Sequence, residues 1–183
     1  MEKTINRVRE YDLRLYLKLY QAGLNNPTLD QFYLFFSRYG ILLFFISFIY
    51  LIWAKRINAL ICSFLAMGLA GLVDLLIYIL WQRPRPFVAH ADLAAAVTDQ
   101  SRVDISSFPS SHTYIAFAIA TSVFLYGHKR LGTLLFIIAI LVAISRIGIG
   151  VHYPSDVIGG AMLGIFSGIV AYLIVHKAER YWE

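Results

Sequence analysis

The sequence predicts an all-α membrane protein, a helical bundle of about five transmembrane helices with an amphipathic interfacial helix at its N-terminus. Composition is the first observation that leads there. Hydrophobic residues make up 59% of the 183 residues and charged residues 15%, with a mean hydropathy of +0.66. A soluble domain has about 45–50% apolar and about 25% charged residues. The second observation is five apolar runs, each close to the ~20 residues that cross a hydrocarbon core of about 30 Å.

Residues 1–24 form the first predicted element, ahead of an integral membrane domain at residues 25–183. Apolar side chains recur at spacings of three and four between Leu13 and Leu24, and Arg14 and Lys18 lie among them. This pattern is typical of a helix that lies along the membrane interface. The sequence Asn25-Asn26-Pro27 then interrupts the helix.

The five apolar runs cover residues 32–54, 60–81, 110–126, 131–150 and 157–175. The third run begins with polar residues, and the fourth carries Ser145 and Arg146 near its end. Polar groups in such helices must face water or a protein cavity. Because the start of the third run and the end of the fourth lie on the same side of the membrane, we expect two polar clusters on one face.

The basic residues of the short loops predict the orientation, because such residues prefer the cytoplasmic side. Three segments carry these residues: one between the first and second runs, one between the third and fourth, and one after the fifth. Because the chain crosses the membrane with each run, all three segments fall on the same face; their basic residues are Lys55, Arg56, Lys129, Arg130, Lys177 and Arg180. We therefore expect an integral protein of the plasma or inner membrane whose polar clusters face the outer, extracytoplasmic side. Five basic residues within residues 1–18 argue against this, but interleaved acidic residues dilute their effect.

His152 and Asp156 are the first candidates for chemistry. A histidine can attack phosphorus if one ring nitrogen is unprotonated and an acceptor holds the other. Pro154 suits the first turn of the last helix, so His152 precedes that helix and Asp156 lies in its first turn, close enough to hydrogen-bond. The alternative is that the two residues only cap the helix.

Arg146 comes six residues before His152, and two glycines between them allow the backbone to bend. A guanidinium and an imidazole could then converge on one anion. The alternative for Arg146 is a membrane anchor that extends to the interface. Ser110, Ser111 and His112 follow Pro109 at the N-terminus of the third run, where free backbone N–H groups and the helix dipole favour anions.

Arg83 and Arg85 alternate with Pro84 and Pro86 just beyond the second run. Guanidinium groups bind phosphate bidentately, although basic residues at this boundary also meet lipid headgroups. Together with the other two clusters, this segment forms the third side of a predicted phosphate pocket.

These three segments resemble the motifs of the type 2 phosphatidic acid phosphatases, which share a site with vanadium haloperoxidases. The resemblance covers about residues 30–175. The second and third motifs are matched by Pro109, Ser110, Ser111 and His112, and by Ser145, Arg146, His152 and Asp156. The first motif is matched by Arg85 and Pro86, but Tyr78 stands where the family has a lysine, and Arg83 is a candidate to replace that charge.

The resemblance implies a role for each residue. His152 would be the nucleophile, Asp156 its orienting partner and His112 the general acid, through a phosphohistidine intermediate. Arg85, Ser110, Ser111 and Arg146 would hold the phosphate. No metal and no other cofactor is expected, because no further cluster of histidines and carboxylates is present in the sequence.

The substrate is predicted from residues 84–90 and the short five-helix layout, which resemble the bacitracin-resistance type of undecaprenyl diphosphate phosphatase. That subgroup commonly has aspartate where this chain has Ser111. Phosphatidylglycerophosphate, phosphatidic acid and lipid A phosphatases share the same core, and a non-catalytic lipid-phosphate binder or transporter is a further alternative. The expected partners are a lipid phosphate or diphosphate and the bilayer, with no nucleic acid; the oligomeric state stays open.

Two further residues are weaker candidates. Asp74, inside the second run, could support the site, since intramembrane acids are often functional. His90 could contact a distal phosphate. Residues 91–107 are polar enough for a surface loop or short helix over the site, and this segment is a candidate lid.

Overall fold

The computed structural model describes residues 2–90 and 106–182, which are all helix, turn or irregular backbone. Side chains are described from residue 9 to residue 181 within those ranges. The elements are α1 (Glu2–Leu24), α2 (Pro27–Trp53), α3 (Ile57–Leu80), α4 (Pro86–Ala89), α5 (Ser111–Leu125), α6 (Lys129–Gly148) and α7 (Pro154–Trp182). Residues 91–105 lie outside the described residues, so the lid stays a prediction.

Four of these helices, α2, α3, α6 and α7, are long and apolar enough to cross a membrane. Their outer faces carry apolar side chains such as Phe45 and Ile49, which are 54% and 67% exposed. Such exposure suits lipid and not water. The predicted third run forms α5, a shorter apolar helix of 15 residues, so the structure supports four spans by length and adds one short helix.

Helix α5 is the centre of the bundle. It packs against α7, α6 and α3, and its side chains from Ala116 to Val123 are buried. Glycines of α7 allow close contact: a Cβ at Gly160 would lie 2.8 Å from the carbonyl oxygen of Ser110, and one at Gly164 would meet the Tyr114 carbonyl. Small residues let two helix backbones approach in this way. The contact fixes the N-terminus of α5 beside the first turns of α7.

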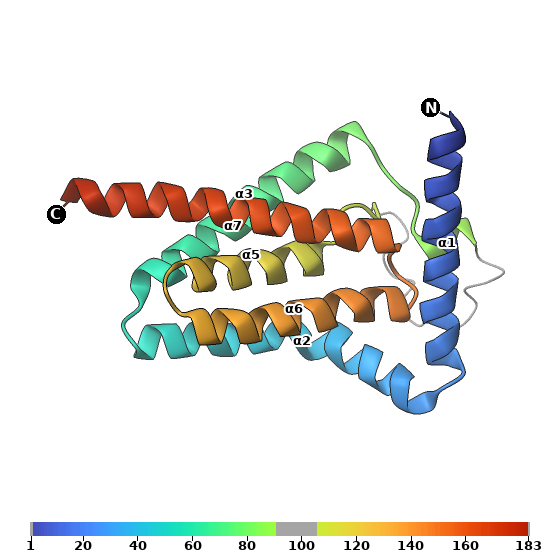
Figure 1. Cartoon of the computed structure of the whole chain (residues 1–183), viewed down its shortest axis with the longest axis horizontal. Helices are drawn as coiled ribbons and strands as arrows, with labels where there is room; N and C mark the ends of the chain where they lie inside the picture. Colours follow the sequence, from blue (N-terminus) through green and yellow to red (C-terminus); the bar gives the residue numbers. More distant parts are fainter. Residues whose placement is uncertain (1, 91–105, 183) are drawn as a thin grey trace.

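Helix α1 runs across one end of the bundle, steeply inclined to the other helices (Figure 1). It packs mainly on α6 and α2, with fewer contacts to α7. Asn26 caps the next helix, because its side-chain oxygen accepts hydrogen bonds from the backbone N–H groups of Thr28 and Leu29, and Pro27 occupies the first helical position. The prediction of a break at residues 25–27 is confirmed.

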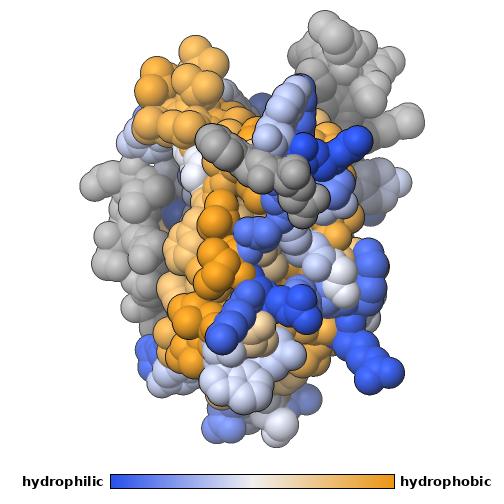
Figure 2. Space-filling view, turned by 90° about the vertical axis from the view of Figure 1, so that its left-hand side faces the viewer, coloured by the Kyte–Doolittle hydropathy of each residue, from blue (hydrophilic) through white to orange (hydrophobic). Residues whose placement is uncertain are grey.

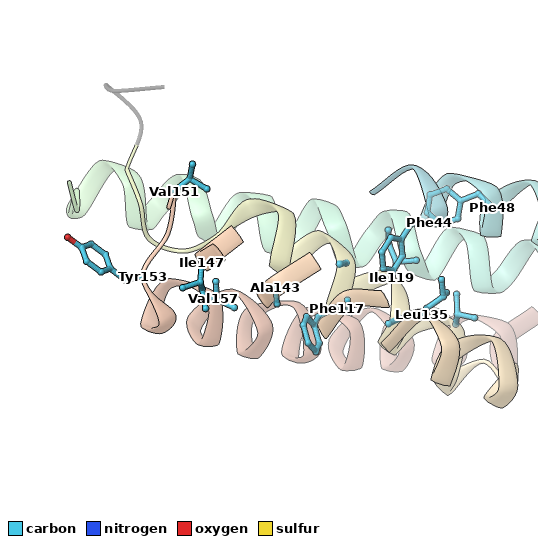
Figure 3. Close-up of a cluster of buried hydrophobic side chains, with 14 of the residues drawn as sticks. Phe44, Phe48, Phe117, Ile119, Leu135, Ala143, Ile147, Val151, Tyr153 and Val157 are labelled. Atoms are coloured by element: carbon cyan, nitrogen blue, oxygen red, sulfur yellow. The ribbon is translucent and has the colours of Figure 1, made fainter. Parts of the chain in front are cut away.

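The apolar core runs through the bundle and reaches this same end. Phe44, Ile119 and Leu135 lie in its middle part, and Ile147, Val151 and Val157 lie near the loop that joins α6 to α7 (Figure 3). All six side chains are buried. The loop therefore rests on a packed layer, which limits how far its backbone can move.

Candidate active site

His152 lies in the loop between α6 and α7, and Asp156 lies in the first turn of α7. Both side chains are buried, at 2% and 0% exposure. The expected close approach is present, but Nδ1 of His152 is 3.7 Å from Oδ2 of Asp156, longer than a hydrogen bond. Instead, the backbone carbonyl oxygen of Ser107 lies 2.8 Å from Nδ1. The predicted direct hydrogen bond is therefore replaced by one to the backbone.

The second ring nitrogen of His152 faces an arginine. Nη1 of Arg85 is 3.4 Å from Nε2 of His152 and donates a hydrogen bond of 3.1 Å to the carbonyl oxygen of Val151. A carbonyl only accepts and a guanidinium only donates. The two partners therefore select the tautomer with the proton on Nδ1 and the lone pair on Nε2.

Burial lowers the pKa of His152 from 6.5 to about 4. Asp156 opposes the shift, whereas Arg146 and Arg85 add to it because two nearby cations disfavour a third positive charge. The imidazole is thus neutral at pH 7. A neutral imidazole with a lone pair on Nε2 is the form that can act as a nucleophile.

Ser107 belongs to residues 91–107, which we expected to form a surface loop or short helix over the site, and a surface position is wrong for this residue. Its side chain is fully buried, and its hydroxyl donates a 2.5 Å hydrogen bond to Oδ2 of Asp156. Its N–H donates to the carbonyl oxygen of Arg83, which ties the two segments together. The only signal in the sequence was its position directly before the Phe108-Pro109-Ser110 segment.

Asp156 is held from several sides. Its Oδ2 also accepts the N–H of Tyr153 at 2.8 Å, and its Oδ1 accepts Nη1 of Arg83 at 2.5 Å. Its own backbone carbonyl accepts the N–H of Ser110, which joins the N-terminus of α5 to α7. A buried carboxylate is stable only when it is satisfied in this way.

Arg83 makes a second ion pair, with Asp12 of α1. Nη2 of Arg83 is 2.6 Å from Oδ2 of Asp12, and the guanidinium lies 4.1 Å from the centre of the Tyr153 ring. The guanidinium is thus engaged by two carboxylates and one aromatic face. Asp12 was not a candidate from the sequence, where it was one of several acids in a mixed-charge segment.

Arg146, in the last turn of α6, is 8% exposed and donates a 2.5 Å hydrogen bond to the hydroxyl of Ser37 on α2. Ser37 was also not predicted. The hydroxyl of Ser145 donates to the carbonyl oxygen of Val142 in its own helix, a contact that serves the helix and not the site.

The serine and histidine of the second motif lie where the sequence predicted them. Ser110 is the N-cap of α5, is fully buried, and its hydroxyl oxygen accepts a hydrogen bond from Thr113. Ser111 and His112 are the first two residues of α5 and are partly buried. This places them one and two residues from the contact between Ser110 and Asp156.

The remaining candidates lie at the edge of the site or outside it. Tyr78 is 37% exposed on α3, and Asp74, one turn earlier, accepts a 3.1 Å hydrogen bond from the Tyr114 hydroxyl. The His90 ring meets the Tyr153 ring edge-on at 6.4 Å. In the part of the chain that the structure describes, no three His, Cys, Asp or Glu side chains gather as a metal ion would need. A metal-free reaction stays a prediction.

Comparisons with known proteins assign the chain to a family. The model of the PAP2 superfamily matches residues 59–180, well over half of the chain. The chain belongs to the PAP2 superfamily. The undecaprenyl-diphosphatase BcrC of Bacillus subtilis (strain 168) is 33% identical over 156 residues, which cover 81% of this PAP2 protein and 76% of the relative. The bacitracin transport permease protein BcrC of Bacillus licheniformis is 46% identical over 72 residues, which cover 39% of this chain and 35% of that protein.

Two solved structures are similar to this PAP2 protein. Aquifex aeolicus LpxE superimposes with a TM-score of 0.66 and 30% identity, over 87% of this chain and 93% of that one. The first transmembrane PAP2 type phosphatidylglycerolphosphate phosphatase from Bacillus subtilis gives a TM-score of 0.65 and 26% identity, over 94% and 88%. With its membrane-spanning helices, the chain is a membrane lipid phosphatase, a phosphoric ester hydrolase.

Proposed function

We propose that this PAP2 phosphatase converts undecaprenyl diphosphate to undecaprenyl phosphate through a phosphohistidine on His152. The observation that carries the proposal is the buried, neutral imidazole of His152, whose Nε2 faces Arg85 while Nδ1 is held by the Ser107 carbonyl oxygen. A nucleophile needs this combination of an available lone pair and a fixed second nitrogen.

The first step forms a bond between Nε2 of His152 and the terminal phosphorus. The bridging P–O bond breaks, its electron pair stays on the lipid phosphate oxygen, and His112 supplies the proton to that oxygen. In the second step His112 removes a proton from water, the water oxygen bonds to phosphorus, and the P–N bond returns its electrons to Nε2. Inorganic phosphate leaves and both histidines regain their starting states.

Charge on the transferred phosphoryl group is stabilised by the cations and N–H groups around it. Arg85 and Arg146 are buried, and Ser110 and Ser111 stand at the N-terminus of α5. Positioning and electrostatic stabilisation are the main sources of catalysis in phosphoryl transfer. In this proposal Arg85, Arg146, Ser110 and Ser111 are phosphate ligands, and Asp156 positions the segment that carries His152.

The proposed topology has five spans, with α5 as a short central one, and α1 along the membrane interface. The loops that join α2 to α3 and α5 to α6, and the last turns of α7, lie at the end opposite to α1 (Figure 1). The basic residues Lys55, Arg56, Lys129 and Lys177 belong to these segments or directly adjoin them, and they are exposed. Figure 2 shows hydrophilic side chains gathered at that end beside apolar ones. Basic loops favour the cytoplasm, so the site would open to the extracytoplasmic side.

The choice of substrate is supported by the match to the undecaprenyl-diphosphatase of Bacillus subtilis over most of both chains. The likeness to a phosphatidylglycerolphosphate phosphatase favours a glycerophospholipid as the second candidate. Phosphatidic acid and lipid A remain candidates from the shared motifs.

Phosphate release in detergent, with a chelator present, tests the proposal. The wild type should turn over undecaprenyl diphosphate faster than phosphatidylglycerophosphate, phosphatidic acid or lipid A, and His152→Ala should be inactive. Loss of wild-type activity on chelation contradicts the metal-free mechanism. Full activity in His152→Ala contradicts the nucleophile, and a preference for a glycerophospholipid contradicts the substrate. Lipid binding without turnover in the wild type would favour the non-catalytic alternative.

A further inference from the structure

Asp12 is a buried carboxylate on a helix that contributes no residue to the family motifs. Its exposure is 8%, whereas the side chains of Glu10 and Arg14, two residues away on either side, are 61% and 70% exposed. Burying a carboxylate costs free energy unless hydrogen bonds or a counter-charge replace its water. The buried carboxylate of Asp12 therefore requires hydrogen-bond donors or a counter-charge, which the exposed charged residues of α1 do not.

Those partners belong to the catalytic end of the bundle. Oδ1 of Asp12 accepts the backbone N–H of Ser155 at 2.8 Å, and Oδ2 accepts the Ser155 hydroxyl at 2.6 Å and Nη2 of Arg83 at 2.6 Å. Ser155 is the second residue of α7, so Asp12 caps α7 from another helix. Charge-assisted hydrogen bonds of this length are among the stronger ones in proteins.

Arg83 connects Asp12 to Asp156. Its Nη2 binds Asp12, while its Nη1 binds Oδ1 of Asp156 and the Ser155 hydroxyl. Oδ2 of Asp156 is then left for Ser107 and the Tyr153 N–H, the two contacts beside His152. One planar guanidinium thus fixes two carboxylates relative to each other, which a flexible lysine would do less well.

The same face of α1 also packs against Tyr153, the residue that follows His152. Tyr16, one turn after Asp12, is fully buried and lies 5.7 Å, ring centre to ring centre, from both Tyr20 and Tyr153. Arg83 covers the Tyr153 ring. Helix α1 therefore contacts the segment from residue 153 to residue 156 through both aromatic packing and ion pairing.

We propose that Asp12 is a positioning residue for phosphoryl transfer, which acts through Arg83 and the N-terminus of α7 on Asp156 and so on the aim of His152. The inference rests on the proposed role of His152. It gives α1 a catalytic purpose beyond membrane contact, and it gives Arg83 a role other than replacing the missing lysine at Tyr78.

The test is a double-mutant cycle in the full-length protein with undecaprenyl diphosphate as substrate. Asp12→Asn keeps the size of the side chain and removes the charge that binds Arg83. We expect kcat to fall about 10-fold to 100-fold, the usual range for removing a residue that orients a ligating group, with KM nearly unchanged. Arg83→Gln should lower kcat similarly, and the double variant should be no worse than the poorer single variant, since coupled residues are not additive.

Glu10→Gln is the matched control, because it removes an exposed carboxylate from the same helix. It should keep wild-type kcat, and thermal unfolding in detergent should show that all variants are folded. Wild-type kcat in Asp12→Asn, a rise in KM alone, or multiplicative losses in the double variant would each overturn the inference. If His152→Ala is inactive while Asp12→Asn is normal, only the positioning role fails; if His152→Ala is active, the proposed function fails first.

Discussion

The two ends of the helical bundle both carry charged residues, but they hold them differently. At the end that α1 crosses, Asp12, Arg85, Arg146 and Asp156 are at most 8% exposed. At the other end, the basic residues of the loops and of the last turns of α7 are exposed. Exposed charges cost little and interact weakly through water, whereas buried ones are costly without compensation. The buried charges at the end that α1 crosses therefore suit a catalytic site, and the exposed charges at the other end suit a membrane boundary.

The largest expected effect is at the centre of the buried network. Asp156→Asn should lower kcat about 10³-fold to 10⁴-fold, because an amide cannot accept the hydrogen bonds of Arg83, Ser107 and Tyr153 together, and loss of the charge at a histidine's partner has an effect of this order elsewhere. Phosphate release from undecaprenyl diphosphate measures it. Asp30→Asn, in the first turn of α2, is the control. A loss below tenfold would show that the network does not direct His152.

The pH dependence is the next way to sharpen the contrast between buried and exposed groups. With the pKa of His152 lowered to about 4, about nine-tenths of the free enzyme has a neutral imidazole at pH 5, whereas an ordinary histidine would retain only a few per cent. The neutral, reactive form falls to half at about pH 4 and is lost below that pH, as the imidazole gains a proton.

The measurement is kcat/KM between pH 4 and pH 8, because this ratio reports the groups of the free enzyme. We expect no fall from His152 between pH 7 and pH 5. A fall in kcat/KM at low pH with an apparent pKa near 6.5, assigned to His152, would contradict the burial of His152 beside two arginines.

A smaller effect is expected from Ser37, which anchors Arg146 from α2. Ser37→Ala leaves a buried guanidinium without the hydroxyl that binds Nη1, and a hydrogen bond to a charged group contributes about 1.5–3 kcal/mol. If Arg146 holds phosphate, KM should rise about 10-fold to 100-fold, because each 1.4 kcal/mol is a factor of ten in an equilibrium constant. Ser47→Ala is a matched control, since Ser47 is buried on the same helix and its hydroxyl donates to the carbonyl oxygen of Phe44 in that helix. Equal effects of both variants would assign the change to α2 packing.

The sequence predicted the long apolar helices, but it predicted neither the short α4 nor the buried residues that contact the candidate site residues. Apolar run length located α2, α3, α6 and α7 within a few residues, although α7 continues to Trp182 where the predicted run ends at residue 175. That extension begins with His176 and Lys177, which are exposed, so hydropathy carries no signal for it. Likewise, a 15-residue α5 is shorter than its predicted run because Ser110 caps it and Tyr126 ends it.

The supporting residues were missed for a physical reason. Asp12, Ser37 and Ser107 act through contacts with residues between 24 and 143 positions away in the sequence. Local spacing predicts which residues share a helix face, but it does not predict which helix crosses which. The His152–Asp156 contact was predictable because four residues at a helix start determine it; the Ser107 carbonyl that takes Nδ1 was not.

The smallest effect is expected at the exposed end, where it tests the orientation. Lys129→Cys, in a Cys62→Ala background, should keep wild-type kcat because Lys129 is exposed and far from the buried network. Cys62 is the sole cysteine of the chain and is fully buried, so its removal leaves one reactive thiol. A membrane-impermeant maleimide should label Lys129→Cys only in opened cells, and Gln82→Cys, at the end that α1 crosses, in intact cells. The reverse labelling pattern would place the buried charges on the cytoplasmic side and make the five basic residues within residues 1–18, not the loops, the determinant of orientation.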